Sequence, residues 1–145
     1  RKVINKFITV LIALFVGGCA TPPSRYNPDN IGILDLAFID MEKIPFMKVR
    51  HRPSVVSVVD ENATEVITTN MMKSMHFNVG LKEGKYVVML KCDDTYTYGF
   101  PVVPVVLEKG KRYLAYCRRI VKEGDYIGLD GFIREKSEPP PPYQK

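Results

Sequence analysis

The sequence predicts an all-β fold, a single antiparallel β-sandwich spanning residues 31–136. Many short runs in this segment are rich in β-branched and aromatic side chains, which are enriched in strands. Turn sequences such as DEN, KEGK, EKGK and KEGD separate the runs and supply Asn, Asp or Gly where the chain must reverse. Only residues 69–75 have a weakly helical pattern, and this stretch is too short for an independent helix. Short strands at regular spacing favour a sandwich or a partly closed barrel.

The first 18 residues have the order of a secretory signal peptide. Basic residues at positions 1, 2 and 6 precede an apolar run at 7–16, and two glycines follow it. A membrane-spanning helix needs about 20 apolar residues, more than this run contains. Since none of the 16 acidic residues precedes Cys19, the chain from Cys19 onward has 18 basic residues against 16 acidic ones and is only +2. Its charges are mixed along the chain, which argues against a nucleic-acid partner.

The segment Val16-Gly17-Gly18-Cys19 resembles the lipobox of bacterial lipoproteins. The resemblance implies cleavage before Cys19, attachment of lipid to its thiol and acylation of the new amino group. Several acyl chains on one residue form a durable membrane anchor. Ala20, in place of the Asp associated with inner-membrane retention, favours the outer membrane with the domain facing the periplasm. The alternative is an ordinary signal peptide that is cut at another position.

These signals divide the chain into a signal peptide (1–18), a lipidated tether (19–30), the sandwich domain (31–136) and a Pro-rich tail (137–145). The tether is rich in Pro, Ser, Asn and Asp and has no periodicity, which indicates a flexible segment. The four successive prolines of the tail cannot form a helix or donate ladder hydrogen bonds, so we expect an extended polyproline II conformation.

Within the domain we expect strands at residues 31–40, 53–59, 64–69, 75–79, 86–92, 102–107, 112–120 and 126–133. Two stretches are near copies, LKEGKYVVMLKC at 81–92 and LEKGKRYLAYC at 107–117. Either two unrelated core strands use the same turn chemistry, or the two turns form a structural pseudo-repeat. In both cases alternation predicts one buried face per strand, made of Tyr86, Val88, Leu90 and Cys92 in the first and of Tyr113, Ala115 and Cys117 in the second. The pattern also resembles small envelope lipoproteins with transthyretin- or immunoglobulin-like domains, and this implies a fold more than a role.

With Cys19 assigned to lipid, Cys92 and Cys117 remain, and an oxidising periplasm would allow them to pair. In a simple meander, strand 102–107 would separate them by two inter-strand steps of about 4.8 Å each, beyond the roughly 7 Å Cα limit of a disulfide. Pro104 has no N–H to donate, which indicates that this strand lies at an edge. If the two Cys strands face each other across the sandwich, a bridge becomes possible. The alternatives are therefore an inter-sheet disulfide and two buried thiols.

One methionine-rich cluster is a candidate for metal chemistry. Met71, Met72, Met75 and His76 offer soft ligands of the kind that suits Cu(I), or else flexible side chains that fill gaps in the core. The adjacent acids at 93 and 94 are typical of a turn, although they could touch calcium. The chain has two histidines and neither a GxSxG nor an HExxH motif. We therefore expect a protein that is not an enzyme, with no catalytic residue, metal or cofactor.

The basic run Lys48, Arg50, His51 and Arg52 is a candidate for an anionic partner such as a lipopolysaccharide phosphate or a cell-wall carboxylate. The simpler interpretation is a solvated strand face, because alternation would place residues 48, 50 and 52 on the same side.

We expect a non-catalytic structural or accessory subunit, held to the membrane by its lipid, that binds another envelope protein. The edge strand with Pro104 and the Pro-rich tail are the expected contact surfaces, since extended segments bind partners at low ordering cost. The alternative is a periplasmic ligand-binding or inhibitor lipoprotein that uses the loop at 93–100. Tyr96, Tyr98 and Phe100 would point to one side of that loop if it is extended, or would cover one end of the core.

Overall fold

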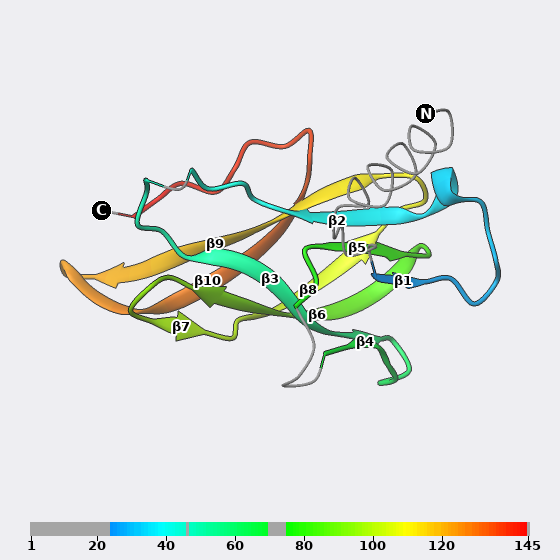
Figure 1. Cartoon of the computed structure of the whole chain (residues 1–145), viewed down its shortest axis with the longest axis horizontal. Helices are drawn as coiled ribbons and strands as arrows, with labels where there is room; N and C mark the ends of the chain where they lie inside the picture. The colour runs from blue at the N-terminus through cyan, green and yellow to red at the C-terminus, as the bar shows by residue number, and fades with distance from the viewer. Residues whose placement is uncertain (1–23, 46, 70–74, 145) are drawn as a thin grey trace, which may run out of the picture.

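The computed structural model describes residues 24–45, 47–69 and 75–144, and in these ranges the chain is an all-β sandwich of two packed sheets (Figure 1). The strands are β1 (Ser24–Tyr26), β2 (Ala37–Met41), β3 (Arg52–Asp60), β4 (Glu65–Thr68), β5 (Asn78–Leu81), β6 (Gly84–Asp93), β7 (Tyr98–Gly99), β8 (Val102–Leu107), β9 (Arg112–Lys122) and β10 (Asp125–Glu135), with a 3₁₀ turn η1 (Ile33–Asp35). Among the described residues, no helix has the length and apolarity needed to cross a membrane. The predicted fold class is confirmed.

Each sheet combines strands from distant parts of the chain. Sheet I has the order β1-β5-β2-β9-β10, and sheet II has the order β4-β3-β6-β7, with β8 also paired to β6. Most pairs are antiparallel, but β1 with β5 and β2 with β9 run parallel. No other described strand pairs with β8, so the prediction that Pro104 marks an edge strand is confirmed.

Six of the eight expected strands form within two residues of their predicted bounds, and the differences lie near the N-terminus and before β5. The expected strand at 31–40 is interrupted by η1, where the carbonyl of Asp35 accepts a hydrogen bond from the N–H of Gly110, at 3.2 Å. The expected strand at 75–79 begins later because His76 forms a single bridge with Val55 of sheet II before the chain enters sheet I as β5.

Part of the segment expected as a tether, residues 19–30, forms a strand. Residues 24–26 are strand β1, and Ser24 pairs with Val79 of β5 in the parallel register. A strand of three residues has too little alternation to be recognised in a sequence, and here it forms because β5 offers an unpaired edge. Cys19 and the rest of the segment 1–23 lie outside the described residues.

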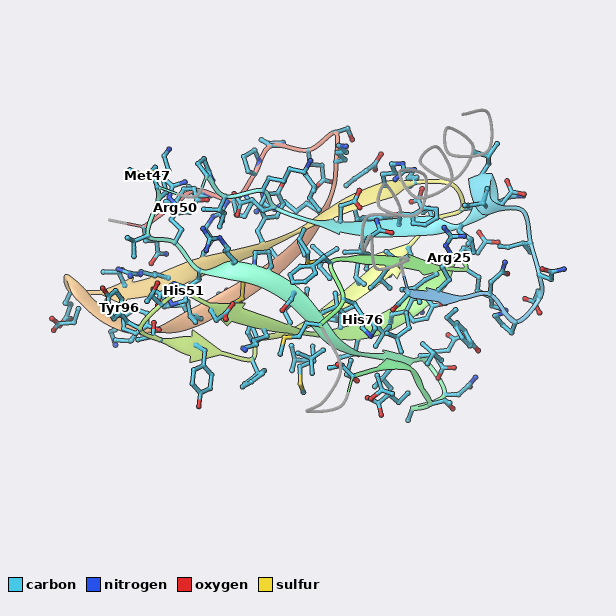
Figure 2. All side chains as sticks on the ribbon, in the orientation of Figure 1. Arg25, Met47, Arg50, His51, His76 and Tyr96 are labelled. Atoms are coloured by element: carbon cyan, nitrogen blue, oxygen red, sulfur yellow. A yellow bond between two sulfur atoms is a disulfide. The ribbon has the colours of Figure 1, made fainter. Side chains whose placement is uncertain are left out.

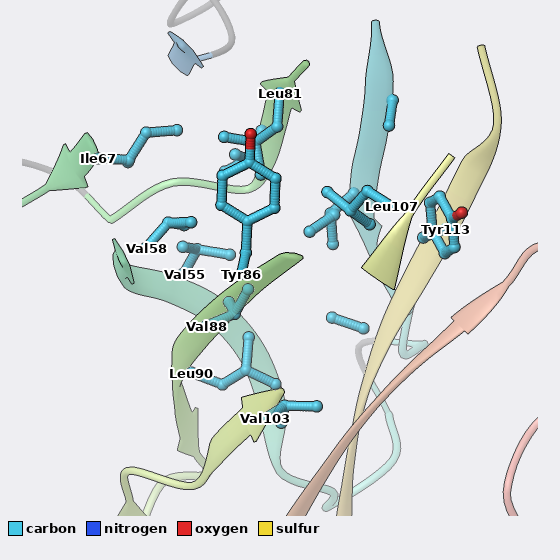
Figure 3. Packing of buried hydrophobic residues seen from close by; sticks show 14 of the residues in the cluster. Val55, Val58, Ile67, Leu81, Tyr86, Val88, Leu90, Val103, Leu107 and Tyr113 are labelled. Carbon is cyan, nitrogen blue, oxygen red and sulfur yellow. The ribbon is translucent and has the colours of Figure 1, made fainter. Parts of the chain in front are cut away.

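The core lies between the inward faces of the two sheets (Figure 3). The predicted buried faces of β6 and β9 are confirmed, because each of their seven residues is at most 6% exposed. Aliphatic side chains from other strands complete the core: Ile39, Val55, Val58, Leu81, Val103 and Leu107.

The two near-copy turns close in related ways on opposite sheets. The Tyr86 hydroxyl donates to the carbonyl of Lys82 at 2.8 Å, four residues earlier. The Tyr113 hydroxyl accepts a hydrogen bond from the N–H of Glu108 at 2.9 Å, five residues earlier. In the second turn Gly110 has φ +72°, the left-handed conformation that favours glycine. Each tyrosine therefore ties a core strand to the turn that leads into it.

The disulfide alternative is confirmed for the cysteine pair. Cys92 lies on β6 of sheet II and Cys117 on β9 of sheet I, with their Cα atoms 5.8 Å apart and their sulfurs bonded. In a simple meander β8 would lie between the two Cys strands and keep them apart. In the structure β8 is an edge strand of sheet II that pairs with β6, and β9 belongs to sheet I, so β8 does not separate them. The bridge joins the two sheets through the core.

Candidate functional site

An exposed apolar surface covers the outer side of two paired strands in sheet II. Alternation buries Tyr86, Val88 and Leu90 of β6, so the residues between them point outward. We call the outward group the β6–β8 face: Val87, Met89, Val102 and Val106, which are 36–62% exposed, together with Pro104, which is also exposed. Val87 lies opposite Pro104 and Met89 opposite Val102, so the side chains form one continuous patch. A solvated outer face of an antiparallel sheet is normally polar.

A hollow of about 300 Å³ lies at one end of the β6–β8 face. Val87, Pro104 and Val106 form its apolar walls, and Lys85 and Glu61 stand beside them. An apolar concavity flanked by charged side chains is typical of a contact site for another molecule.

The predicted aromatic residues extend this surface towards the loop that contains β7. Tyr96 is 82% exposed, Tyr98 70% and Phe100 48%, so the three rings face solvent and do not cover the end of the core. The structure brings Tyr98 and Phe100 together in an edge-to-face contact, with ring centroids 5.8 Å apart. Pro104, the fourth predicted contact residue, is exposed on the neighbouring strand β8.

Asp94 holds this loop in a fixed conformation. Its Oδ1 accepts hydrogen bonds from the N–H groups of Tyr96 and Thr97, each at 2.7 Å, and its own N–H donates to the Thr97 carbonyl at 3.0 Å. Burial alone would raise the pKa of Asp94, but the N–H groups of Thr97 and Tyr96 and the nearby His51 outweigh it and hold that pKa below its usual value. Asp94 thus acts as a turn residue. No group of three potential metal ligands occurs among the described His, Cys, Asp and Glu side chains.

His51 is only 4% exposed and contacts the loop through Thr97 and Asp94. Its Nε2 lies 2.7 Å from Thr97 Oγ1 and 3.4 Å from Asp94 Oδ2, and its ring stacks on Tyr126. Burial lowers the pKa of His51, with Arg119 acting in the same direction and Asp94 against it. Of the basic run, Lys48 and Arg52 are exposed and Arg50 is partly exposed, as the solvated interpretation predicts. Only Arg52 lies on a strand, because β3 begins there.

The Pro-rich tail lies against sheet I, not away from the domain. Residues 139–144, which we call the C-terminal strap, run beside β9 and the segment after β2 (Figure 1). Arg118 Nε donates to the Pro141 carbonyl at 2.8 Å, and the Val121 N–H donates to Gln144 Oε1 at 2.7 Å. Pro141 is buried. The Pro141 carbonyl and the Gln144 side chain of the strap therefore make hydrogen bonds within their own chain.

Tyr143 anchors the end of the strap. Its ring lies between two guanidinium groups, with the Cζ atom of Arg50 3.7 Å and that of Arg118 3.8 Å from the ring centroid. Its hydroxyl donates to Glu42 at 2.8 Å, and burial together with this hydrogen bond raises the pKa of Tyr143. This cluster has no signal in the sequence, because Glu42 and Tyr143 are 101 residues apart.

The methionine–histidine cluster is only partly within the described residues, since Met71 and Met72 lie outside them. Met75 accepts a hydrogen bond from Ser54 at 3.1 Å. His76 has both ring nitrogens engaged, Nδ1 with the Ser24 hydroxyl and Nε2 with the Thr68 carbonyl at 3.0 Å. The described part of the cluster thus joins β1 to the neighbourhood of β4, a contact that sequence reasoning missed.

No protein-family model, curated protein or solved structure matches this chain. The class of protein that the geometry defines is an all-β sandwich with a fixed aromatic loop beside an exposed apolar sheet face.

Proposed function

We propose that this protein is a non-catalytic accessory lipoprotein, anchored in the outer membrane through Cys19, that binds another envelope protein through the β6–β8 face and the adjoining aromatic loop. The observation that carries the proposal is the exposure of Val87, Val102 and Val106 on one face of sheet II, together with the exposed Tyr98, which lies opposite Asp93 farther along β6.

The composition of this surface supports a protein partner. Contiguous apolar patches on soluble domains mark interaction sites, and tyrosine is enriched among the residues that dominate binding energy. Asp94 already fixes the loop, so little conformational entropy is lost when the rings are covered. Pro104 interrupts the hydrogen-bonding edge of β8, which favours side-chain packing on the face over open-ended strand addition.

The compartment is supported by two independent features. The lipobox resemblance at residues 16–19 predicts export and lipid attachment. The disulfide between Cys92 and Cys117 is typical of proteins that fold in an oxidising compartment such as the periplasm. A non-catalytic role is supported by the two histidines, which are both engaged in structural contacts.

Site-specific photocrosslinking in cells tests the protein partner. A photoreactive amino acid is placed at Tyr98 or Val106, and the control position is Leu34 of η1, which is 87% exposed outside the proposed surface. We expect the same single protein adduct from Tyr98 and Val106 and none from Leu34. Identical adducts from all three positions, or no protein adduct from either test position, would contradict the proposal.

Mass spectrometry of the native N-terminus tests the anchor separately. We expect Cys19 as the first residue of the mature chain, with its sulfur in a thioether lipid. A Cys19→Ser variant should then be released from the membrane fraction. A free Cys19 thiol that reacts with an alkylating reagent would remove the lipoprotein assignment and leave the binding surface untouched.

A ligand-binding or inhibitor lipoprotein is the second candidate function, favoured by the exposure of Tyr96 at the tip of the fixed loop. In the crosslinking experiment this function predicts no protein adduct and a small molecule that copurifies with the protein. Tyr96→Ala should abolish that copurification.

A further inference from the structure

A second candidate site lies at the end of the molecule that contains Arg50 and His51, separate from the β6–β8 face (Figure 2). It is a pocket of about 230 Å³ between the segment before β3, strand β9 and the C-terminal strap. Its lining residues are Val49, Arg50, His51, Cys117, Arg119, Tyr143 and Gln144, and none of them is acidic.

The cations of this pocket are only partly neutralised. Arg50 makes no ion pair with any described residue. Arg119 lies 3.6 Å from Asp94 Oδ2, which it shares with His51, while Asp94 Oδ1 is occupied by the N–H groups of the loop. Asp93 also acts on His51 from farther away, and Glu42 is taken up by Arg118 and by the Tyr143 hydroxyl. Arg50 is therefore the arginine of this pocket that lacks an acidic partner among the described residues.

The side chains are oriented so that hydrogen-bond donors remain for a ligand. The Cζ atom of Arg50 lies 3.7 Å from the centroid of the Tyr143 ring, and Arg50 also hydrogen-bonds Tyr143. Its remaining N–H groups are donors that can bind an oxyanion. Gln144 uses its Oε1 to accept from Val121, so its amide NH₂ group is left as a donor. With Arg119 of β9, the donors come from three separate segments.

A second hollow with basic residues adjoins this pocket. This hollow of about 220 Å³ is lined by Arg118, Arg119 and Arg134, together with Asp130 and residues of the strap. Arg119 lines both spaces. The strap lines both spaces as well, and the carbonyl oxygens of Pro141 and Pro139 accept hydrogen bonds from Arg118 and Arg134, at 2.8 and 3.0 Å.

We propose that this pocket binds a phosphoryl group, with Arg50 and Arg119 as the charged donors and Gln144 as a neutral one. A phosphoryl group has several acceptor oxygens in a tetrahedral arrangement, which suits donors that converge from different segments. The pocket is smaller than the roughly 300–1,000 Å³ of typical small-molecule sites, so it fits a headgroup or a free phosphate better than a larger metabolite. A lipid headgroup and free phosphate both offer a phosphoryl group, and separate probes distinguish them.

The test is a titration of the purified full-length chain, followed by NMR shifts of backbone amides around residues 49–51 and 117–121. The probes are inorganic phosphate and a soluble short-chain phosphatidylglycerol. We expect saturable shifts that Arg50→Gln and Arg119→Gln each weaken by roughly tenfold, the size of one lost charge-assisted hydrogen bond. Tighter binding of the lipid probe assigns a headgroup ligand, and tighter binding of phosphate assigns a free one.

The matched control is Arg112→Gln, because Arg112 also lies over an aromatic ring, that of Phe38, but lines a different hollow. Arg50→Gln removes a contact of Tyr143 and could weaken binding by loosening the strap. Arg119→Gln leaves the contacts of Tyr143 with Arg50 and Arg118 in place, so a loss of binding in this variant reports on the pocket itself. Absence of saturable shifts with both probes overturns the proposal. Equal losses in the Arg112→Gln and Arg119→Gln variants also overturn it, because they would show nonspecific charge attraction.

Discussion

Arg118 and Glu42, which are 76 residues apart in the chain, form an ion pair with two hydrogen bonds at 2.7 and 3.1 Å. Arg118 is 3% exposed in its side chain and Glu42 16%, so the pair is largely withdrawn from water. It connects the segment that follows β2 to the middle of β9. Because Tyr143 also donates to Glu42, the same pair fixes the C-terminal strap.

Replacing Arg118 by leucine should destabilise the fold strongly. Glu42 would lose both charged hydrogen bonds while it stays partly buried, and breaking a buried pair on one side costs about 3–5 kcal/mol. We expect the free energy of unfolding, measured in urea, to fall by about 3 kcal/mol.

The control for this change is Arg112→Leu, which breaks an exposed pair with Asp40 at 3.7 Å. An exposed pair contributes at most about 1 kcal/mol. Equal losses in the two variants would contradict the structural role of the buried pair.

Reduction of the disulfide should weaken the sandwich without changing its strands. The bridge joins residues 25 positions apart, and closing a loop of this length stabilises the fold by about 3 kcal/mol. We expect a reductant to lower the unfolding midpoint of the native protein. The double variant Cys92→Ala/Cys117→Ala should be equally destabilised and insensitive to reductant, and a sensitive double variant would show that the reductant acts elsewhere.

The stability of the fold should decrease as the pH falls below about 6.5, the ordinary pKa of histidine. Burial lowers the pKa of His51 in the folded state, so the unfolded chain binds more protons between that lowered pKa and 6.5. The stabilisation from a neutral His51 is therefore complete above 6.5 and is lost as the pH falls towards the folded-state pKa.

Unfolding free energies between pH 7.5 and 5 measure this effect, and His51→Gln should remove part of the slope. Asp94 titrates in a lower range, because its pKa is also held below its ordinary value of 3.8. An unchanged slope in His51→Gln would assign the pH dependence to other groups.

Gly131 of β10 should not tolerate a side chain. A Cβ atom at this position would lie 3.0 Å from Pro101 Cγ and from Val103 Cγ2, and 3.1 Å from Leu90 Cδ1. Overpacking of this kind typically costs about 1–3 kcal/mol, so we expect Gly131→Ala to lower the unfolding free energy by about 1–2 kcal/mol.

The matched control lies on the same strand. A Cβ atom at Gly128 would meet only Ile120 Cδ1, at 3.9 Å, so Gly128→Ala should change stability by less than about 0.5 kcal/mol. If both variants behave alike, the loss at Gly131 reflects the backbone and not the contact between β10 and β8.

The sandwich was predictable wherever strands carry a strong local pattern. The alternation of β6 and β9 predicted both buried faces, and Pro104 predicted the edge position of β8. Strand β1 was not predictable, because three residues show no periodicity and pair only through a distant edge. The sequence left open whether Tyr96, Tyr98 and Phe100 face solvent or cover the end of the core. In the structure they face solvent, on a loop whose turn is held by Asp94.

The sequence by itself determined the strand positions and the inward side chains, because these follow from the two-residue period of an extended chain and from turn residues nearby. Only the tertiary structure decided which sheet each strand joins, and therefore that Cys92 meets Cys117 across the core. It also placed the Pro-rich tail against Arg118 and brought Arg50 together with Arg119. These contacts join residues far apart in the chain, so they depend on sheet order and packing, which no local pattern encodes.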